Sequence, residues 1–308
     1  MSEQVDGSDG PAEMSDPSGR LERSADEFIE IFDVLLTGLD LKFSPTIPMC
    51  AVVARTVAER QVNALRASIV LGKNNLGQLA SAFVRQACEE QIWLKYIAQL
   101  ESAVADRLLS TMGDSDVMRG LLAFRDYAGL DALVKLGFPA YFVQWVDVYV
   151  GKAKSDFSEL GDQLGWPNRK RPPSTDWIAD QVGDRRTYDY LFAASSRVVH
   201  FSAGEAFRNT WWDAEMRLHL TEGRQNHQYA FALDCLILTA LRTFRSVFVI
   251  MGSSSKIELD EDTLLDAMRR YMELGRVPLM IPEEFNLRPH QVGYMVKLYR
   301  DCEAGQSL

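Results

Sequence analysis

Hydrophobic and polar residues follow one another along this chain with the period of an amphipathic α-helix. Between residues 21 and 39, apolar side chains return after three, four and seven positions, at Phe28, Ile31, Phe32 and Leu35. Such a stripe predicts a helix with one buried face. Similar stripes predict helices over residues 49–71, 79–100, 106–112, 117–137, 139–164, 187–203, 226–252, 260–274 and 289–303.

The connection between the second and third predicted helices is short. Residues 72–77 read Gly-Lys-Asn-Asn-Leu-Gly and separate two long apolar patterns. Helices joined so closely are expected to pack antiparallel, with a glycine in the left-handed position that ends the first. No segment shows the alternating pattern and turn residues of a strand hairpin. The sequence therefore predicts an all-α fold, a multi-helix bundle with long antiparallel helices.

The chain divides into three predicted parts. Residues 1–20 are acidic and rich in Ser, Gly and Pro, which is typical of a disordered tail and not of a signal peptide. Ser24, with Glu27 three residues later, is expected to cap the first helix. Residues 21–252 form the predicted bundle domain, and residues 253–308 a small helical C-terminal extension packed on it.

The composition indicates a globular protein with a substantial core. Apolar residues make up 47 % of the 308 residues, and the net charge is −10. This charge disfavours non-specific binding to nucleic acid or an anionic membrane, because both need a basic face. Cys50, Cys88 and Cys235 lie in apolar helical patterns, and no C-x-x-C occurs. We expect them to be buried, unpaired thiols of a reducing, cytoplasmic compartment.

The segment 229–251 is the most apolar and is long enough to be considered for a membrane span. Asp234, Arg242 and Arg245 interrupt it. Three charges are too costly to expose to lipid. The segment is therefore predicted to be a core helix, and no membrane association is expected.

Arg85 and Glu89 stand four positions apart within an apolar helical segment. On a helix they share one face, and burying two charges is costly unless they pair. One interpretation is a structural ion pair within the helix. The other is that both side chains face a polar cavity shared with a second helix.

The predicted second helix carries its own polar face. Ser196 and His200 are four positions apart on it, Arg197 lies beside them, and Tyr188 and Ser195 add hydroxyl groups. A histidine exposed in a cleft titrates near neutral pH and can act as a general acid or base. A lone histidine in an apolar helix is more often a hydrogen-bonded structural group.

Several familiar chemistries lack their signatures. A catalytic triad is not indicated, because Ser196 and His200 lie on one helix and no G-x-S-x-G turn occurs. Neither a metal-ligand spacing nor a glycine-rich phosphate loop is present, so no metal and no cofactor is predicted. The Asp-x-Asp pairs at 114–116 and 260–262 are expected to be solvated acids of turns or helix starts.

Two further features allow a structural and a functional interpretation. The basic run at residues 169–171 is either a solvated loop or a contact for an anion. The pair Trp211–Trp212 either closes an edge of the core or stacks a ring-shaped ligand.

The order of these motifs resembles a bacterial, all-helical family of domains of unknown function, DUF5677. The likeness covers about residues 50–250 and runs from R-x-x-x-E with a following tryptophan, through a proline-rich loop and a capped helix, to Y…S-x-x-x-H. It implies a helical bundle and no assigned activity. It also implies that the family's polar positions are Arg85, Glu89, Ser196 and His200.

A more distant similarity is to the HEPN helical bundles, many of which are ribonucleases. Those carry an arginine and a histidine near the end of a helix. Arg197 and His200 are closer together than that motif requires, which counts against RNA cleavage by such a pair.

Two functions follow from these interpretations. The first is a binding or regulatory module with a buried Arg/Glu/His cluster, whose candidate partners are a small polar ligand and a second copy of the chain. The second is a hydrolase or ribonuclease of a stress or phage-defence system, with His200 as general acid/base and Arg197 or Arg85 stabilising a phosphate-like transition state. Only this alternative involves nucleic acid. The first is favoured because no catalytic signature is complete, and whether the protein is an enzyme stays open.

Overall fold

The structure, a computed structural model, describes residues 17–39, 47–199, 210–212, 218–220, 222–252 and 260–278. The predicted all-α fold class is confirmed, and the helix predicted at 289–303 lies outside the described residues. The helices are α1 (Pro17–Gly38), α2 (Met49–Lys73), the 3-10 helix η1 (Gly77–Ala80), α3 (Ser81–Ile97), α4 (Ser102–Ala128), α5 (Leu130–Lys135), α6 (Ala140–Leu164), α7 (Thr175–Gln181), α8 (Arg185–Val199), α10 (Glu222–Gly252) and α11 (Glu261–Leu274).

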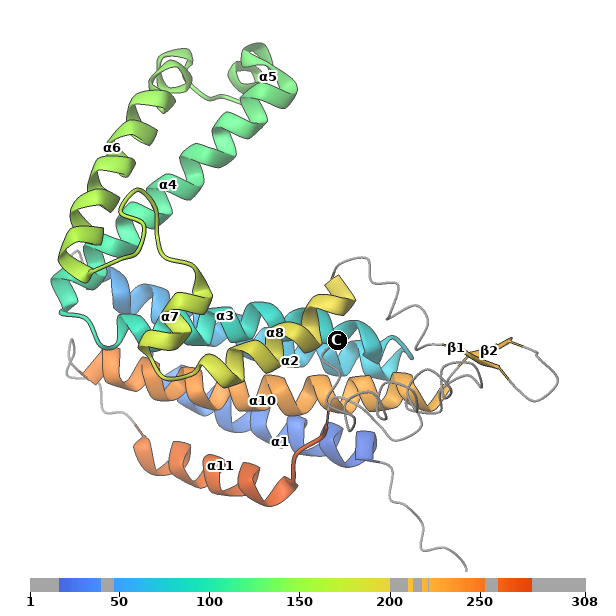
Figure 1. Ribbon diagram of the computed structural model, residues 1–308. Helices are drawn as coiled ribbons and strands as arrows, with labels where there is room; N and C mark the ends of the chain where they lie inside the picture. Colours follow the sequence, from blue (N-terminus) through green and yellow to red (C-terminus); the bar gives the residue numbers. More distant parts are fainter. Residues whose placement is uncertain are drawn as a thin grey trace, which may run out of the picture.

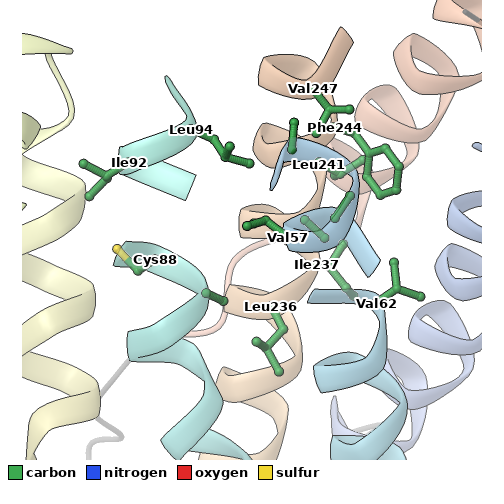
Figure 2. Close-up of a cluster of buried hydrophobic side chains, with 14 of the residues drawn as sticks. Val57, Val62, Cys88, Ile92, Leu94, Leu236, Ile237, Leu241, Phe244 and Val247 are labelled. Atoms are coloured by element: carbon green, nitrogen blue, oxygen red, sulfur yellow. The ribbon is translucent and has the colours of Figure 1, made fainter. Parts of the chain in front are cut away.

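Helix α10 runs through the middle of the bundle (Figure 1). It packs against α2 and α3, and α1, η1 and α11 also contact it. Figure 2 shows part of this core, with Leu94 pointing from α3 toward α10 and Ile92 on the opposite side of α3. Phe244 of α10 stacks on Phe32 of α1 with ring centroids 5.0 Å apart. The apolar stripes read from the sequence therefore meet in one core.

The segment Gln225–Gly252 of α10 is long and apolar enough to cross a membrane by length and composition. In the bundle, 72 % of its most apolar stretch is buried. The core helix of a bundle has this composition because its apolar residues face protein on most sides. The predicted place of this segment in the core is confirmed.

Tyr229 of α10 shapes the turn from α2 to α3. A Cβ atom on Gly72 would lie 2.2 Å from Tyr229 Cζ, and one on Gly77 would lie 2.6 Å from Tyr229 Cγ. The Tyr229 hydroxyl donates to Glu22 Oε2 at 3.0 Å. The left-handed position in this turn belongs to Asn75, with φ of 58°, so the prediction that a glycine takes it is wrong. The two glycines instead leave room for the ring.

Helix α1 begins earlier than predicted, at Pro17. Proline suits a first helical turn because an N–H there has no partner within the helix. Ser24 is consequently inside the helix, and its predicted role as N-cap is wrong. Residues 17–20, assigned to the tail, are helical, and the rest of the tail lies outside the described residues.

Helices α4, α5 and α6 form an arm that extends away from the other helices (Figure 1). Helix α4 packs along α6 and contacts α2 near the base of the arm. The sequence predicted two helices at 106–112 and 117–137, but α4 is continuous to Ala128 and is capped by Gly129, whose φ is 85°. The break lies there because that backbone conformation is accessible chiefly to glycine.

The two Asp-x-Asp pairs differ in their positions. Asp114 and Asp116 lie inside α4, where Asp116 pairs with Arg119, so they are not helix-start acids. Asp260 is the N-cap of α11 and accepts a hydrogen bond from the Thr263 N–H at 2.9 Å. Only the second pair has the predicted helix-start position.

One buried carboxylate fastens α11 to the bundle. Asp234 of α10 is fully buried, and its Oδ1 accepts from the Tyr271 hydroxyl at 2.6 Å. Its Oδ2 accepts from Arg276 Nε at 3.0 Å and from the Val277 N–H at 3.2 Å. We call these four residues the C-terminal latch. They connect α11 and the segment that follows it to the central helix.

Two three-residue strands, β1 (Thr210–Trp212) and β2 (Leu218–Leu220), pair antiparallel with Trp211 opposite His219. The sequence analysis did not predict them, since such short strands leave no alternating pattern to detect. The backbone of the predicted tryptophan pair therefore lies in β1, and its side chains lie outside the described residues.

Candidate functional site

Helices α3 and α8 lie side by side and run antiparallel (Figure 1). Lys95, near the end of α3, bonds Asp184, just before α8. Arg85, near the start of α3, lies against Phe192 in the second half of α8. The fold thus brings together the two segments that the sequence singled out as polar. We call Arg85, Glu89, Tyr188, Phe192 and Ser196 the α3–α8 seam.

Arg85 and Glu89 form the predicted pair within α3. Arg85 Nε donates to Glu89 Oε1 at 3.0 Å, and the two side chains are 28 % and 35 % exposed. The Arg85 guanidinium carbon also lies 4.4 Å from the centroid of the Phe192 ring, in cation–π geometry. The pair is therefore an intrahelical ion pair that also contacts the second helix. It is only partly buried, so solvent and solutes can reach both charges.

Tyr188 places a nearly buried phenol beside this pair. Its ring centroid lies 5.2 Å from that of Phe192. Burial raises the pKa of the Tyr188 hydroxyl, and the negative charge of Glu89 raises it further. The phenol therefore remains protonated at neutral pH and can donate a hydrogen bond.

Ser195 and Ser196 are neighbours with different hydrogen bonding. The Ser195 hydroxyl is buried and donates to the Leu191 carbonyl oxygen at 2.6 Å. The Ser196 Oγ is also buried, but it has no hydrogen-bond partner in the structure as described. A buried hydroxyl without a partner costs roughly 1–3 kcal/mol. Ser196 therefore has hydrogen-bonding capacity that no described residue satisfies.

Asp184 holds the other end of the two helices together. Its carboxylate accepts from Lys95 Nζ at 2.9 Å and from Gln91 Nε2 at 3.5 Å, both on α3. Arg242 of α10 lies 3.8 Å from its other oxygen. The Asp184 side chain is only 13 % exposed. These partners compensate the negative charge of Asp184, so this cluster positions α8 against α3 and α10.

Cys88 of α3, next to Glu89 in the chain, belongs to the buried core. It is 1 % exposed, and burial, followed by the charge of Glu89, raises the pKa of its thiol to about 12. A thiol protonated at neutral pH is a poor nucleophile. Cys50 and Cys235 are also buried and unpaired, so the predicted burial of all three cysteines is confirmed.

The residues assigned to catalysis are not placed by the structure. His200 lies outside the described residues, and Arg197 is described only as backbone of α8. The predicted meeting of Arg85 with His200 is thus untested, whereas the meeting of Arg85 with the helix that precedes His200 is observed. Within the basic run 169–171, Arg169 pairs with Asp162 at 2.5 Å. No group of three His, Cys, Asp or Glu side chains could hold a metal among the residues that the structure describes.

Sequence reasoning missed two carboxylates that have three polar partners each, Asp184 and Asp234. Asp184 follows Gly183, a helix terminator, and precedes α8, which is a sequence signal for a capping acid. Asp234 is an acid within the most apolar helix, where its charge argues against a membrane span. Its burial was a signal for a partner elsewhere in the chain.

The comparisons with known proteins bear on the family and not on the activity. Residues 51–215, more than half of the chain, match the family described as a family of unknown function, DUF5677. This region includes all but the first two residues of α2, the arm and both helices of the α3–α8 seam. The chain matches none of the curated proteins and none of the solved structures with which it was compared, and the similarity to HEPN bundles is not supported. The resemblance seen in the sequence is confirmed: the chain belongs to the DUF5677 family.

Proposed function

We propose that this protein is a binding module whose α3–α8 seam holds a small zwitterionic molecule. The observation that carries the proposal is the Ser196 Oγ, which is buried without a hydrogen-bond partner in the described structure. It lies one helical turn from Phe192, the ring on which Arg85 stacks. A ligand bound beside Arg85 can supply the missing partner.

The charges of the seam favour a ligand that carries both signs. Arg85 and Glu89 are both accessible and are held 3.0 Å apart. A purely anionic ligand would be repelled by Glu89, and a purely cationic one by Arg85. A zwitterion, such as a free amino acid, matches both charges, and the protonated phenol of Tyr188 adds a donor. A polyanion is disfavoured by Glu89 and by the net charge of −10.

The hydrolase or ribonuclease alternative needs His200 and the side chain of Arg197. Both lie outside the described side chains. No described contact favours that alternative, so the binding function is the better supported conclusion.

The proposal is tested by thermal shift with the free amino acids and inorganic phosphate as probes. We expect at least one amino acid to raise the Tm of the wild-type protein through preferential binding to the folded state. The increase should disappear in Ser196→Ala and in Arg85→Met and persist in Ser195→Ala, the matched control. If no amino acid shifts the Tm, if phosphate alone does, or if the shift survives in both seam variants, the seam is not a zwitterion site.

A further inference from the structure

The end of the arm exposes an unusual number of large apolar side chains. Between residues 117 and 149, which we call the arm tip, only Met118, Leu133 and Val146 are buried among the described large apolar side chains. Ten others are exposed, a group that includes Tyr127 at 90 % and Trp145 at 57 %. Isolated exposed apolar residues are ordinary, but a concentration of this kind marks an interaction surface.

The exposed side chains of α6 form a stripe. Tyr141, Trp145 and Val148 recur at positions i, i+4 and i+7, and all three are more than half exposed. On a helix this spacing defines one face. Val146, the buried residue of this segment, lies on a different face. Helix α6 thus has one apolar side toward α4 and a second apolar stripe directed to solvent.

The charge of the arm tip separates it from the rest of the chain. It contains three basic and three acidic residues and so has no net charge, although the whole chain carries −10. Two copies that meet through their arm tips therefore bring neutral surfaces together and keep their acidic bodies apart. The arginines of the tip are engaged, Arg119 with Asp116 and Arg125 with Asp147 at 3.2 Å. They do not form a basic patch of the kind that binds anionic lipid.

We infer that the arm tip is a homodimer interface, in which the α6 stripe of one chain packs against the same stripe of a second copy. A two-helix hairpin can bury only the faces between its helices, whereas two hairpins together make a four-helix bundle with a shared core. The interface would be isologous, so that one stripe is complementary to itself about a twofold axis.

Light scattering coupled to size-exclusion chromatography tests this inference on the full chain. We expect the wild-type mass to correspond to two chains at high concentration and to fall toward one on dilution. Trp145→Glu, and independently Tyr141→Glu, should give one chain at every concentration, because each places a charge within the apolar stripe. Met272→Glu, at an 80 % exposed position of α11, is the matched control and should leave the dimer unchanged.

Circular dichroism melts of the variants confirm folding, since all three sites are exposed. A wild-type protein that is one chain at all concentrations would overturn the inference, as would a dimer that both stripe variants leave intact. Sedimentation with neutral phosphatidylcholine vesicles tests the alternative that the apolar stripe binds a lipid surface. Vesicle binding by a monomeric wild type, lost in Trp145→Glu, would assign the stripe to a lipid surface and also overturn the dimer.

Discussion

The C-terminal latch and the α3–α8 seam each contain a carboxylate, and the two differ in burial and in hydrogen bonding. Asp234 is fully buried, and both of its oxygens accept hydrogen bonds from Tyr271, Arg276 and Val277. Glu89 is 35 % exposed and has Arg85 as its observed ion-pair partner. In the latch, three hydrogen-bond donors compensate for the burial of the Asp234 carboxylate. The seam carboxylate remains open to solvent and lies near the unpartnered Ser196 Oγ. Polar groups whose hydrogen bonds are satisfied stabilise the fold. A hydroxyl whose hydrogen bonds are unsatisfied keeps the capacity to bind a ligand.

The strongest test of this comparison removes the latch carboxylate. Asp234→Ala should lower the free energy of unfolding by about 3 kcal/mol, because it leaves the buried hydroxyl of Tyr271 and the Val277 N–H without their acceptor. Urea unfolding followed by circular dichroism measures the loss. Tyr271→Phe, which removes one hydrogen bond and keeps the ring, should cost about 1 kcal/mol. If Asp234→Ala lowers the free energy of unfolding by less than about 1 kcal/mol, the latch contributes little to stability.

Alkaline pH tests the burial of Cys88, the neighbour of Glu89 in the chain. Burial raises the folded-state pKa of Cys88 from 9.0 to about 12, so above pH 9 the unfolded chain loses a proton that the folded chain retains. Stability contributed by this group is complete below pH 9 and falls as the pH rises toward 12, by about 1.4 kcal/mol per pH unit. The buried tyrosines add to the fall in the same direction. Unfolding free energies measured from pH 8 to 11 should decline less steeply for Cys88→Ala than for the wild type, and equal slopes would contradict the assignment.

The adjacent serines separate a satisfied hydroxyl from an unsatisfied one. Ser195→Ala removes a hydrogen bond to Leu191 and should destabilise the protein by about 1 kcal/mol. Ser196→Ala removes a buried hydroxyl without a partner and should be neutral or stabilising by up to about 1 kcal/mol. Paired thermal melts compare the two variants. Equal destabilisation by both would mean that Ser196 is structural.

The smallest effect on stability is expected at the ion pair. Glu89→Gln should change the free energy of unfolding by less than about 0.5 kcal/mol, because a solvent-accessible i, i+4 pair contributes little. The same variant should weaken the binding of the zwitterion strongly, since it removes the charge that faces the ammonium group. A loss of several kcal/mol with unchanged binding would assign the pair to the fold and not to the site.

Part of this site could be predicted from the sequence. The spacing of Arg85 and Glu89 predicted their pairing within α3, and the polar face of the 187–203 segment identified the helix against which they lie. The unequal roles of Ser195 and Ser196 could not be predicted, because two neighbouring hydroxyls look alike until the carbonyl positions around them are known. The partners of Asp234 lie 37 to 43 residues away along the chain. No local pattern joins positions so far apart.

The sequence by itself determined the helical period, the apolar stripes and the family, because these depend on residues within a few turns of one another. It also determined that Arg85 needed compensation inside an apolar helix. Only the tertiary structure decided that Asp234 is fully buried and which donors compensate its charge, since burial depends on what packs from elsewhere in the chain. For the same reason it decided that Gly72 and Gly77 leave space for Tyr229, and that the arm carries its apolar stripe away from the bundle.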